Sequence, residues 1–440
     1  MTRRAGLAVV AAAAALQAAL FALDLSPGGR RLWGDESMYW QAAGRVLERG
    51  DSGLELLWPP GQAWFLAAIR GLGGGLLAVA LVQVALVAVA AVALRGALRG
   101  AGAERRVADG AAALVVLYPT LGAFAHYLWP EVLHLALFCL ALWLLAAHRE
   151  RTAACAALGG VLGLALLTKS LLSPLVPAIL AAAAVGGDRR WRRLAAAAVT
   201  LAAVLAPTLW LNHRRHGAAI VASSARFNLW VGLNERERRE FKDRSTLEAL
   251  REWRRGGDTF EERQRILAGR IRAYVADHGA GRILAAQLDR QYYRLFGLPS
   301  FLTEQLPGGE LHGRRRGYRD PPRPLALALG WSHRLTYSAV LLLVPWGLVA
   351  GLRRREPWAV AALALIAYTM AIFLLLHVKS RYRIQLLPAL LPAAVLGGYR
   401  LLDGLRWMRD RASGPAPLGV GEAVTAACGS ALFAVWLFGA

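Results

Sequence analysis

Long runs of apolar residues without a charged side chain restrict the fold of this chain more than any other feature. Many of these runs reach about 18 residues, the length needed to cross a bilayer core of about 30 Å. Hydrocarbon offers no hydrogen-bond partners to a backbone, so a crossing run must be a helix. The Ala-, Leu- and Val-rich runs also lack the alternation that strands of a membrane barrel show. The sequence therefore predicts an all-α polytopic membrane protein.

About ten or eleven membrane-spanning helices are expected from these runs. They are placed at residues 5–25, 75–95, 107–124, 130–148, 153–171, 173–186, 194–212, 325–351, 357–377, 384–402 and 418–438. The apolar segment 62–72 is too short for a full crossing and is expected to be interfacial or re-entrant. The first run resembles a signal peptide, but no small-residue cleavage site follows it, so we interpret it as a retained first helix.

The formal net charge of +23 comes from arginines that lie largely between the apolar runs. Nucleic-acid binding is one explanation of such a charge, but proteins of the inner membrane place positive charge in this way. The arginine-rich loops fall at residues 95–106, 149–151, 189–193, 353–355 and 406–411. With the spans above, all of them lie on the side of the N-terminus, so we expect that side to be cytoplasmic. Nucleic acid is not an expected partner.

The opposite side receives two long segments, which define the expected domain organisation. Residues 1–212 form an N-terminal membrane module that includes a first outer loop at 26–61. Residues 213–324 read as a small, mostly helical outer domain, with helical spacing at 258–275 and 281–296 and a loop at 308–324. Residues 325–440 supply the remaining spans.

The first outer loop contains an acidic pair, Asp35-Glu36, directly after Gly34. A helix from 36 to 48 is expected after this pair, with an apolar stripe that includes Tyr39 lying on the membrane surface. From local sequence, Asp35 is either only the N-cap of that helix or a general base at the membrane edge. The loop ends in Pro59-Pro60-Gly61, which fixes an extended path into the next segment.

Other polar residues are expected at the same outer edge. Glu131 begins the fourth span and Lys169 ends the fifth. Ionisable groups at such depths are costly and usually functional, although a single one can instead extend to the headgroups. Four separate segments that bring acids and bases to one face favour a functional site. The segment between the ninth and tenth spans contributes His377, Lys379, Arg381, Tyr382 and Arg383.

A carboxylate beside several cations is suited to the chemistry of a lipid-linked phosphosugar. The cations would hold the phosphate, which Arg does with a bidentate fork. A nearby carboxylate would take a proton from an attacking hydroxyl group. The lipid tail would lie in the bilayer, the phosphate at the interface and the sugar above it.

These residues together resemble the GT-C superfamily of membrane glycosyltransferases. The resemblance is to the bacterial relatives of protein O-mannosyltransferases and of the aminoarabinose transferase of lipid A, the glycosyltransferase family 39-like group. It covers most of the chain through motifs whose order is more specific than any one of them. These are Asp35-Glu36 with Tyr39, Pro59-Pro60-Gly61, Tyr118-Pro119 before Glu131, Leu167-Thr168-Lys169, Trp210-Leu211-Asn212, Asn228–Asn234 and Arg381-Tyr382-Arg383.

The resemblance implies a GT-C-like bundle and an inverting transfer from a polyprenyl-phosphate sugar to a hydroxyl acceptor outside the cytoplasmic membrane. Asp35 matches the family's base, Glu36 a neighbour that holds the acceptor or a metal, and Glu131 a second acid. Lys169 and Arg381 would hold the donor phosphate, together with Lys379 and Arg383. The residues expected to line the substrate cavity are Tyr39, His126, Asn228, Asn234, His377 and Tyr382.

Several alternatives stay open at the level of sequence. The Asn and Gly residues at 228–234 are either ordinary turn residues or part of the cavity. A transporter or flippase for lipid-linked sugars, or an O-antigen polymerase or ligase, is the alternative function; the chain shows no repeated halves of the kind many transporters carry. A divalent metal is compatible with Asp35, Glu36, Glu131 and His126 but is not required. The sugar and the acceptor, whether glycan, lipid or protein, are not specified; the chain ends without the large outer domain of the aminoarabinose branch, which argues against a lipid A acceptor.

Overall fold

The computed structural model describes residues 3–24, 32, 34–54, 56–186, 188–312, 321–409 and 419–438. Every regular element in these ranges is a helix. The predicted all-α polytopic membrane fold is therefore confirmed. Parts of the predicted loops at 26–61 and 308–324 lie outside the described residues, as does the linker before the last span.

Seven helices in the described ranges are long and apolar enough to cross a membrane. They are α1 (Arg3–Asp24), α4 (Leu76–Gly100), α7 (Glu131–His148), α10 (Arg190–His216), α16 (Arg323–Arg353), η2 with α18 (Ser380–Leu386, Leu387–Arg409) and α19 (Val420–Phe438). Three shorter apolar helices accompany them: α8 (Thr152–Thr168), η1 with α9 (Ser170–Leu175, Val176–Ala184) and α17 (Pro357–Phe373). These ten segments correspond to expected spans.

The expected span at 107–124 is two helices in the structure. α5 (Arg105–Leu117) ends before Tyr118, and α6 (Pro119–Phe124) begins with Pro119 in its first turn. Proline is accepted there because the first amides of a helix have no intrahelical partner, and it holds the preceding residue in an extended conformation. The chain therefore breaks at Tyr118, and α6 leads into the polar segment before α7.

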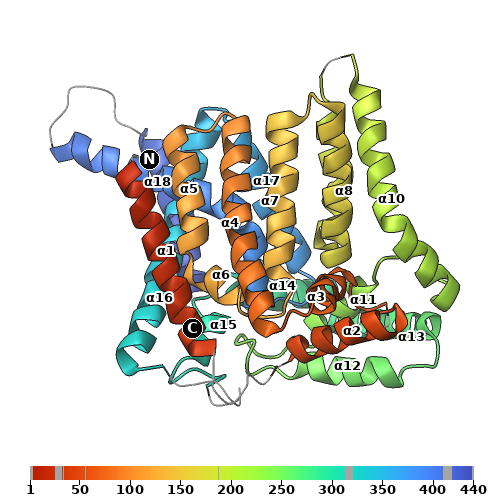
Figure 1. Cartoon of the computed structure of the whole chain (residues 1–440). Coiled ribbons are helices and arrows are strands. Elements are labelled where there is room, and N and C mark those ends of the chain that lie inside the picture. The colour runs from red at the N-terminus through yellow and green to blue at the C-terminus, as the bar shows by residue number, and fades with distance from the viewer. Residues whose placement is uncertain are drawn as a thin grey trace.

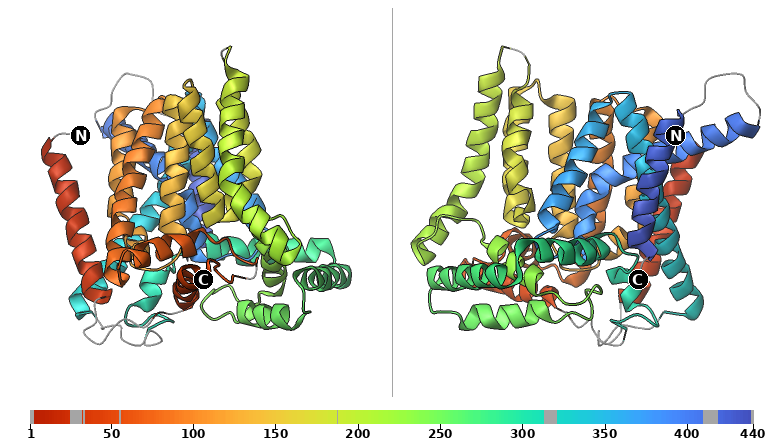
Figure 2. Two further views of the ribbon diagram at one scale, coloured as in Figure 1. Left: turned by 45° about the vertical axis from the view of Figure 1, so that its right-hand side comes forward. Right: turned by 180° about the vertical axis from the view of Figure 1, so that it is seen from behind.

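The spans run between two different ends of the molecule (Figure 1). The described N-terminal end of α1 and the arginine-rich turns after α4, α7, α9 and α16 lie at one end. The other end carries a layer of shorter helices, seen from two further sides in Figure 2. These are α2 (Asp35–Arg49), α3 (Gly61–Gly71), α11 (Ser224–Asn234), α12 (Ser245–Arg255), α13 (Phe260–His278), α14 (Ala280–Phe296) and α15 (Phe301–Gln305).

The layer does not have one core of its own. Phe227 on α11, Trp253 on α12 and Leu267 on α13 belong to a small separate hydrophobic cluster. Phe296 at the end of α14 and Phe301 on α15 are instead buried in the main core of the membrane bundle. The segment expected at 213–324 is thus joined to the bundle through its second half.

Close backbone contact holds α16 and α18 together in the bundle. A Cβ atom added to Gly397 of α18 would stand 2.1 Å from the carbonyl oxygen of Leu343 on α16. At the adjacent Gly398 the nearest atom would be the Leu343 side chain, at an ordinary 3.7 Å. Small residues at such crossings let membrane helices approach closely, which is the main source of their association in lipid.

We predict that Gly397→Ala destabilises the protein, whereas the neighbouring Gly398→Ala does not. The first change forces the backbones of α16 and α18 apart. The second adds a methyl group in ordinary contact with the Leu343 side chain and gains the better helix propensity of Ala. Thermal unfolding of the purified protein in detergent measures both variants. Equal melting temperatures for the two would contradict the observed crossing.

Candidate functional site

A cavity of about 250 Å³ lies where the membrane bundle meets the outer layer. It is lined by segments that are far apart in sequence: the start of α2, the Trp58-Pro59 turn, the start of α7, the end of α8 with η1, the start of α11, and the chain from α17 to η2. The polar and aromatic side chains among its lining residues are Asp35, Tyr39, Trp58, Glu131, Thr168, Lys169, Ser170, Ser173, Ser224, Asn228, Phe373, His377, Arg381 and Tyr382.

Arg381 connects the two acids of this cavity. Its terminal nitrogen donates a hydrogen bond to Asp35 Oδ2 over 2.6 Å, and its Nε lies 3.4 Å from Glu131 Oε1. Lys169 Nζ donates to the same Glu131 oxygen over 3.4 Å. The Glu131 side chain is 1% exposed, and Asp35 is the most exposed of the four at 39%. A buried carboxylate is costly unless it is paired, and Glu131 has two cations beside it.

Aromatic rings hold the two cations from the other side. Lys169 Nζ lies 4.4 Å from the ring centre of Tyr382, and the Arg381 guanidinium lies 4.9 Å from that of Trp129. Tyr382 in turn stacks on Phe373, with ring centres 5.3 Å apart. Cations over ring faces are stabilised by the ring quadrupole, more so where water is excluded. Both cations therefore have an aromatic ring beside them as well as a carboxylate.

Asp35 is the first residue of α2, so the N-cap interpretation is wrong. The cap position is Gly34, which adopts a left-handed φ of 57°, and no side chain caps the helix. Partial burial raises the pKa of Asp35, but the positive charges of Arg381 and Lys379 lower it by more than burial raises it. The pKa of Asp35 therefore lies below its ordinary 3.8. Asp35 is therefore an ionised carboxylate at neutral pH.

The Pro59-Pro60-Gly61 turn positions the end of α8. A Cβ atom on Gly61 would stand 2.6 Å from the carbonyl oxygen of Leu167. The start of α3 therefore packs directly on the backbone just before Lys169. This close approach explains why the turn needs glycine after two prolines.

The two halves of the acidic pair point in different directions. Glu36 is 1% exposed and accepts a hydrogen bond from the backbone N–H of Leu128 over 3.2 Å. It does not line the cavity. Glu36 thus contacts the chain between α6 and α7, and Asp35 alone of the pair faces the cavity.

Three residues expected at the cavity or its phosphate lie elsewhere. His126 is turned toward α1, where its Nε2 lies 3.0 Å from Gln17 Oε1 and its ring packs against Phe21. Asn234 donates to the carbonyl of Trp230 within α11. Arg383 is 1% exposed and donates to the carbonyls of Gly297 and Pro299, both over 2.7 Å.

The physical reason is the local path of the chain. Residues 124–130 turn between α6 and α7, which carries His126 away from Glu131. In the 3₁₀ segment η2, residues two apart point about 120° apart around the helix axis, so Arg381 and Arg383 face different sides. Lys379 is half-buried and does not line the cavity, although its charge acts on Asp35.

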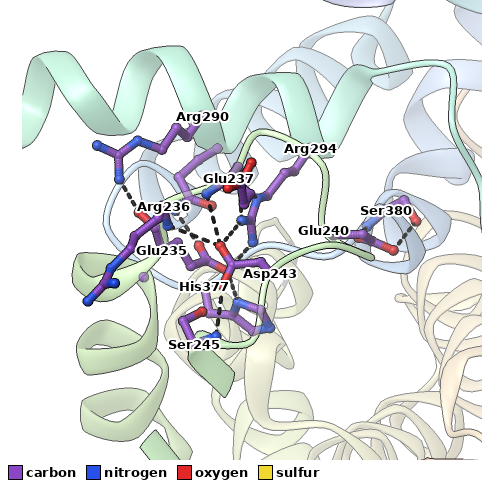
Figure 3. Close-up of polar contacts among 12 residues, drawn as sticks. Glu235, Arg236, Glu237, Glu240, Asp243, Ser245, Arg290, Arg294, His377 and Ser380 are labelled. Carbon is purple, nitrogen blue, oxygen red and sulfur yellow. Dashed lines mark hydrogen bonds and ion pairs between the residues drawn. The ribbon is translucent and has the colours of Figure 1, made fainter. Parts of the chain in front are cut away.

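Glu235, which lies beside His377 (Figure 3), was not among the residues predicted from the sequence motifs. Glu235 is fully buried and accepts a hydrogen bond from Nδ1 of His377. The motif at 228–234 was the available signal: the carbonyl of Asn228 accepts the His377 amide over 2.9 Å, and a Cβ atom on Gly232 would stand 2.8 Å from that amide nitrogen. The glycine lets α11 lie against the backbone of 375–377.

We predict that Gly232→Ala lowers thermal stability, because α11 and the 375–377 backbone would have to separate. Gly269→Ala is the matched control, since a Cβ atom on that helical glycine of α13 would meet nothing within 4 Å. Melting of both purified variants in detergent tests the contact. An unchanged melting temperature for Gly232→Ala would show that α11 is not packed as described.

Within the described ranges, no group of three His, Cys, Asp or Glu side chains is arranged to hold a metal ion. The four residues named above as potential ligands are dispersed. Asp35 and Glu131 share Arg381, whereas Glu36 and His126 contact other segments.

Comparisons with known proteins connect this geometry to a family. Residues 58–211 match the family model described as dolichyl-phosphate-mannose-protein mannosyltransferase. No curated protein matches the chain. The chain is also similar to a solved structure, the archaeal oligosaccharyltransferase AglB from Archaeoglobus fulgidus in complex with an inhibitory peptide and a dolichol-phosphate. The two share 14% sequence identity with a TM-score of 0.47. The alignment covers 99% of this chain and 55% of AglB, so this chain spans about half the length of AglB. The family match, which includes Glu131 and Lys169, confirms the resemblance to GT-C membrane glycosyltransferases that the sequence predicts.

Proposed function

We propose that this protein is an inverting glycosyltransferase that moves a sugar from a polyprenyl-phosphate donor to a hydroxyl acceptor on the outer face of the cytoplasmic membrane. The observation that carries the proposal is the cavity at the membrane boundary that contains one accessible carboxylate, Asp35, and two cations, Lys169 and Arg381. The match to a mannosyltransferase family whose described donor is a lipid phosphate supports it.

The donor phosphate binds between Lys169 and Arg381. Arg381 presents a planar fork of N–H groups that suits phosphate oxygens, and Lys169 adds a point charge. Glu131 holds the two cations side by side, since both contact its Oε1. A lipid tail attached to this phosphate lies in the bilayer, and the sugar extends into the cavity.

The transfer is a single displacement at the anomeric carbon. The acceptor oxygen forms a bond to that carbon while the bond from the carbon to the phosphate oxygen breaks, which inverts its configuration. Asp35 takes the proton of the acceptor hydroxyl. The electron pair of the broken bond leaves with polyprenyl phosphate, and Lys169 and Arg381 stabilise the charge that develops there.

Arg381 couples donor binding to the strength of the base. Without donor, its hydrogen bond to Asp35 keeps the pKa of that carboxyl low, which makes it a weak base. A bound phosphate competes for the same guanidinium and frees Asp35. The carboxylate therefore becomes a stronger base only when there is a sugar to transfer.

Asp35→Asn is predicted to reduce transfer by about 10²–10⁴-fold, the usual contribution of general-base catalysis. Binding of polyprenyl phosphate is expected to persist because both cations remain. Initial rates with radiolabelled polyprenyl-phosphate mannose and a cell-envelope acceptor fraction measure the first quantity; other polyprenyl-phosphate sugars follow if mannose is inactive. Asp51→Asn is the control, since Asp51 lies in the same loop but pairs with Arg215 away from the cavity.

Transfer by Asp35→Asn at the wild-type rate would refute the base assignment. If the wild-type protein transfers no sugar but carries a lipid-linked sugar across the bilayer of a vesicle, the protein is a transporter and the proposal fails.

The pH dependence is predicted to differ between the free and the donor-bound protein. The acid limb of kcat/KM reports the free enzyme, in which the pKa of Asp35 is lowered. The midpoint of this limb is therefore expected below pH 3.8. The acid limb of kcat reports the donor-bound enzyme, in which Arg381 has turned to the phosphate, so it lies at higher pH. Coincident limbs in the two profiles would contradict the coupling through Arg381.

A further inference from the structure

His377 is a buried cavity residue that the proposed transfer does not use. Its side chain is 5% exposed and lines the same cavity as Asp35 and Arg381. Its Nδ1 donates to Glu235 at the end of α11 (Figure 3). The other ring nitrogen, Nε2, is buried and has no hydrogen-bond partner among the described residues. A buried polar atom without a partner is costly and calls for an explanation.

The position of the ring is fixed from the outer layer. Glu235 is fully buried and accepts hydrogen bonds from Arg294 and, over 2.6 Å, from Gln291. Arg294 in turn donates to Asp243 over 2.6 Å and to the Glu237 carbonyl over 3.0 Å. Figure 3 shows these groups gathered around Glu235 and His377. The carboxylate is therefore held in place, and the imidazole with it.

This arrangement determines which nitrogen of His377 carries the proton. Glu235 already accepts from Arg294 and Gln291, and it acts as an acceptor toward His377 as well, so Nδ1 bears the hydrogen. Burial lowers the pKa of His377 below its ordinary 6.5, and Lys379 and Arg294 act in the same direction, whereas Glu235 opposes them. The ring is thus neutral at pH 7, and Nε2 presents a lone pair.

A lone pair selects a hydroxyl group over a phosphate. Oxygens of an ionised phosphodiester only accept hydrogen bonds, so they gain nothing from Nε2 of a neutral imidazole. A sugar hydroxyl donates one readily. The acceptor hydroxyl has its own partner in Asp35, which leaves the hydroxyls of the transferred sugar to meet His377.

We propose that Nε2 of His377 accepts a hydrogen bond from a hydroxyl group of the donor sugar. His377 then recognises the sugar, and Glu235 orients the His377 ring. The inference rests on the proposed function and specifies its substrate as a lipid-phosphate sugar with a free hydroxyl within reach of His377. A site built around such a hydroxyl discriminates strongly against an analogue that lacks it, because the buried partner is then left unpaired.

His377→Asn is the sharpest variant for a test. The Asn amide can keep an N–H directed at Glu235 but offers nothing at the position of Nε2. The full chain in lipid nanodiscs is titrated with polyprenyl phosphate, with polyprenyl-phosphate mannose and with its monodeoxy analogues; polyprenyl-phosphate glucose and arabinose extend the series. The variant should lose about tenfold in affinity for a sugar-bearing lipid and nothing for bare polyprenyl phosphate.

The deoxy analogues provide a second readout that a purely structural role would not change. One deoxy position should weaken binding to the wild type, and the same position should have no effect in His377→Asn, because the two losses share one hydrogen bond. His377→Gln, whose amide oxygen can reach toward the Nε2 position, should restore part of the discrimination. Glu235→Gln, which leaves the ring in place but loosens its orientation, should weaken sugar-dependent binding in the same pattern.

Two outcomes would overturn the inference while the proposed function stands. One is an equal loss for bare and sugar-bearing lipid in His377→Asn, and the other is no loss for either, in a protein whose wild type still transfers sugar. Failure of the proposed function has a different signature: the wild type would transfer none of the sugars, whether or not it binds these lipids.

Discussion

The ion pairs made by Arg381 are the interaction on which the rest of the site depends. One guanidinium touches Asp35 from α2 and Glu131 from α7, and it belongs itself to the turn before α18. Without it, Glu131 would keep Lys169 as an ion-pair partner, and Asp35 would lose the ion pair that the structure gives it. Carboxylates in a partly buried cavity are costly when they are not paired, so Arg381 stabilises the approach of the start of α2 to the start of α7.

The turn that carries Arg381 is held from the outside as well as from the bilayer. Glu240 accepts hydrogen bonds from the backbone and hydroxyl of Ser380, and Glu235 accepts one from His377. Arg383 on the far side of the turn donates to two carbonyls after α14. The outer segments therefore fix the position of residues 377–383 by hydrogen bonds from both sides. This explains why their second half is buried in the same core as the membrane helices.

The sequence predicted the spans, and the end of the bundle at which the candidate residues gather, better than the contacts within the site. Apolar runs and arginine clusters place Asp35, Glu131, Lys169 and Arg381 at one edge, and the structure brings these four together. The direction in which a side chain leaves the backbone depends on the local backbone conformation. The turn after α6 and the 3₁₀ segment η2 therefore decide that His126 and Arg383 contact other segments.

Glu235 shows a different limit of sequence reasoning. It lies in the segment 235–244, in which every residue except Phe241 is charged, and nothing in that segment distinguishes a buried carboxylate from its solvated neighbours. Only the close approach of α11 to the 375–377 backbone, allowed by Gly232, carries it next to His377. The roles of Asp35, Lys169 and Arg381 in transfer stay predictions, since contact alone does not test chemistry.

The cavity is assembled from segments that leave the ribosome at very different times. Asp35, Glu131 and Lys169 are all synthesised before Glu235 and long before Arg381. A nascent chain that has inserted α1 to α10 holds both acids of the site and one of the two cations that pair with them. The ion pair between Asp35 on α2 and Arg381 cannot form until the turn after α17 is synthesised. The site therefore closes late in biosynthesis, and a protein truncated by arrested translation before that turn would be inserted in the membrane yet inactive.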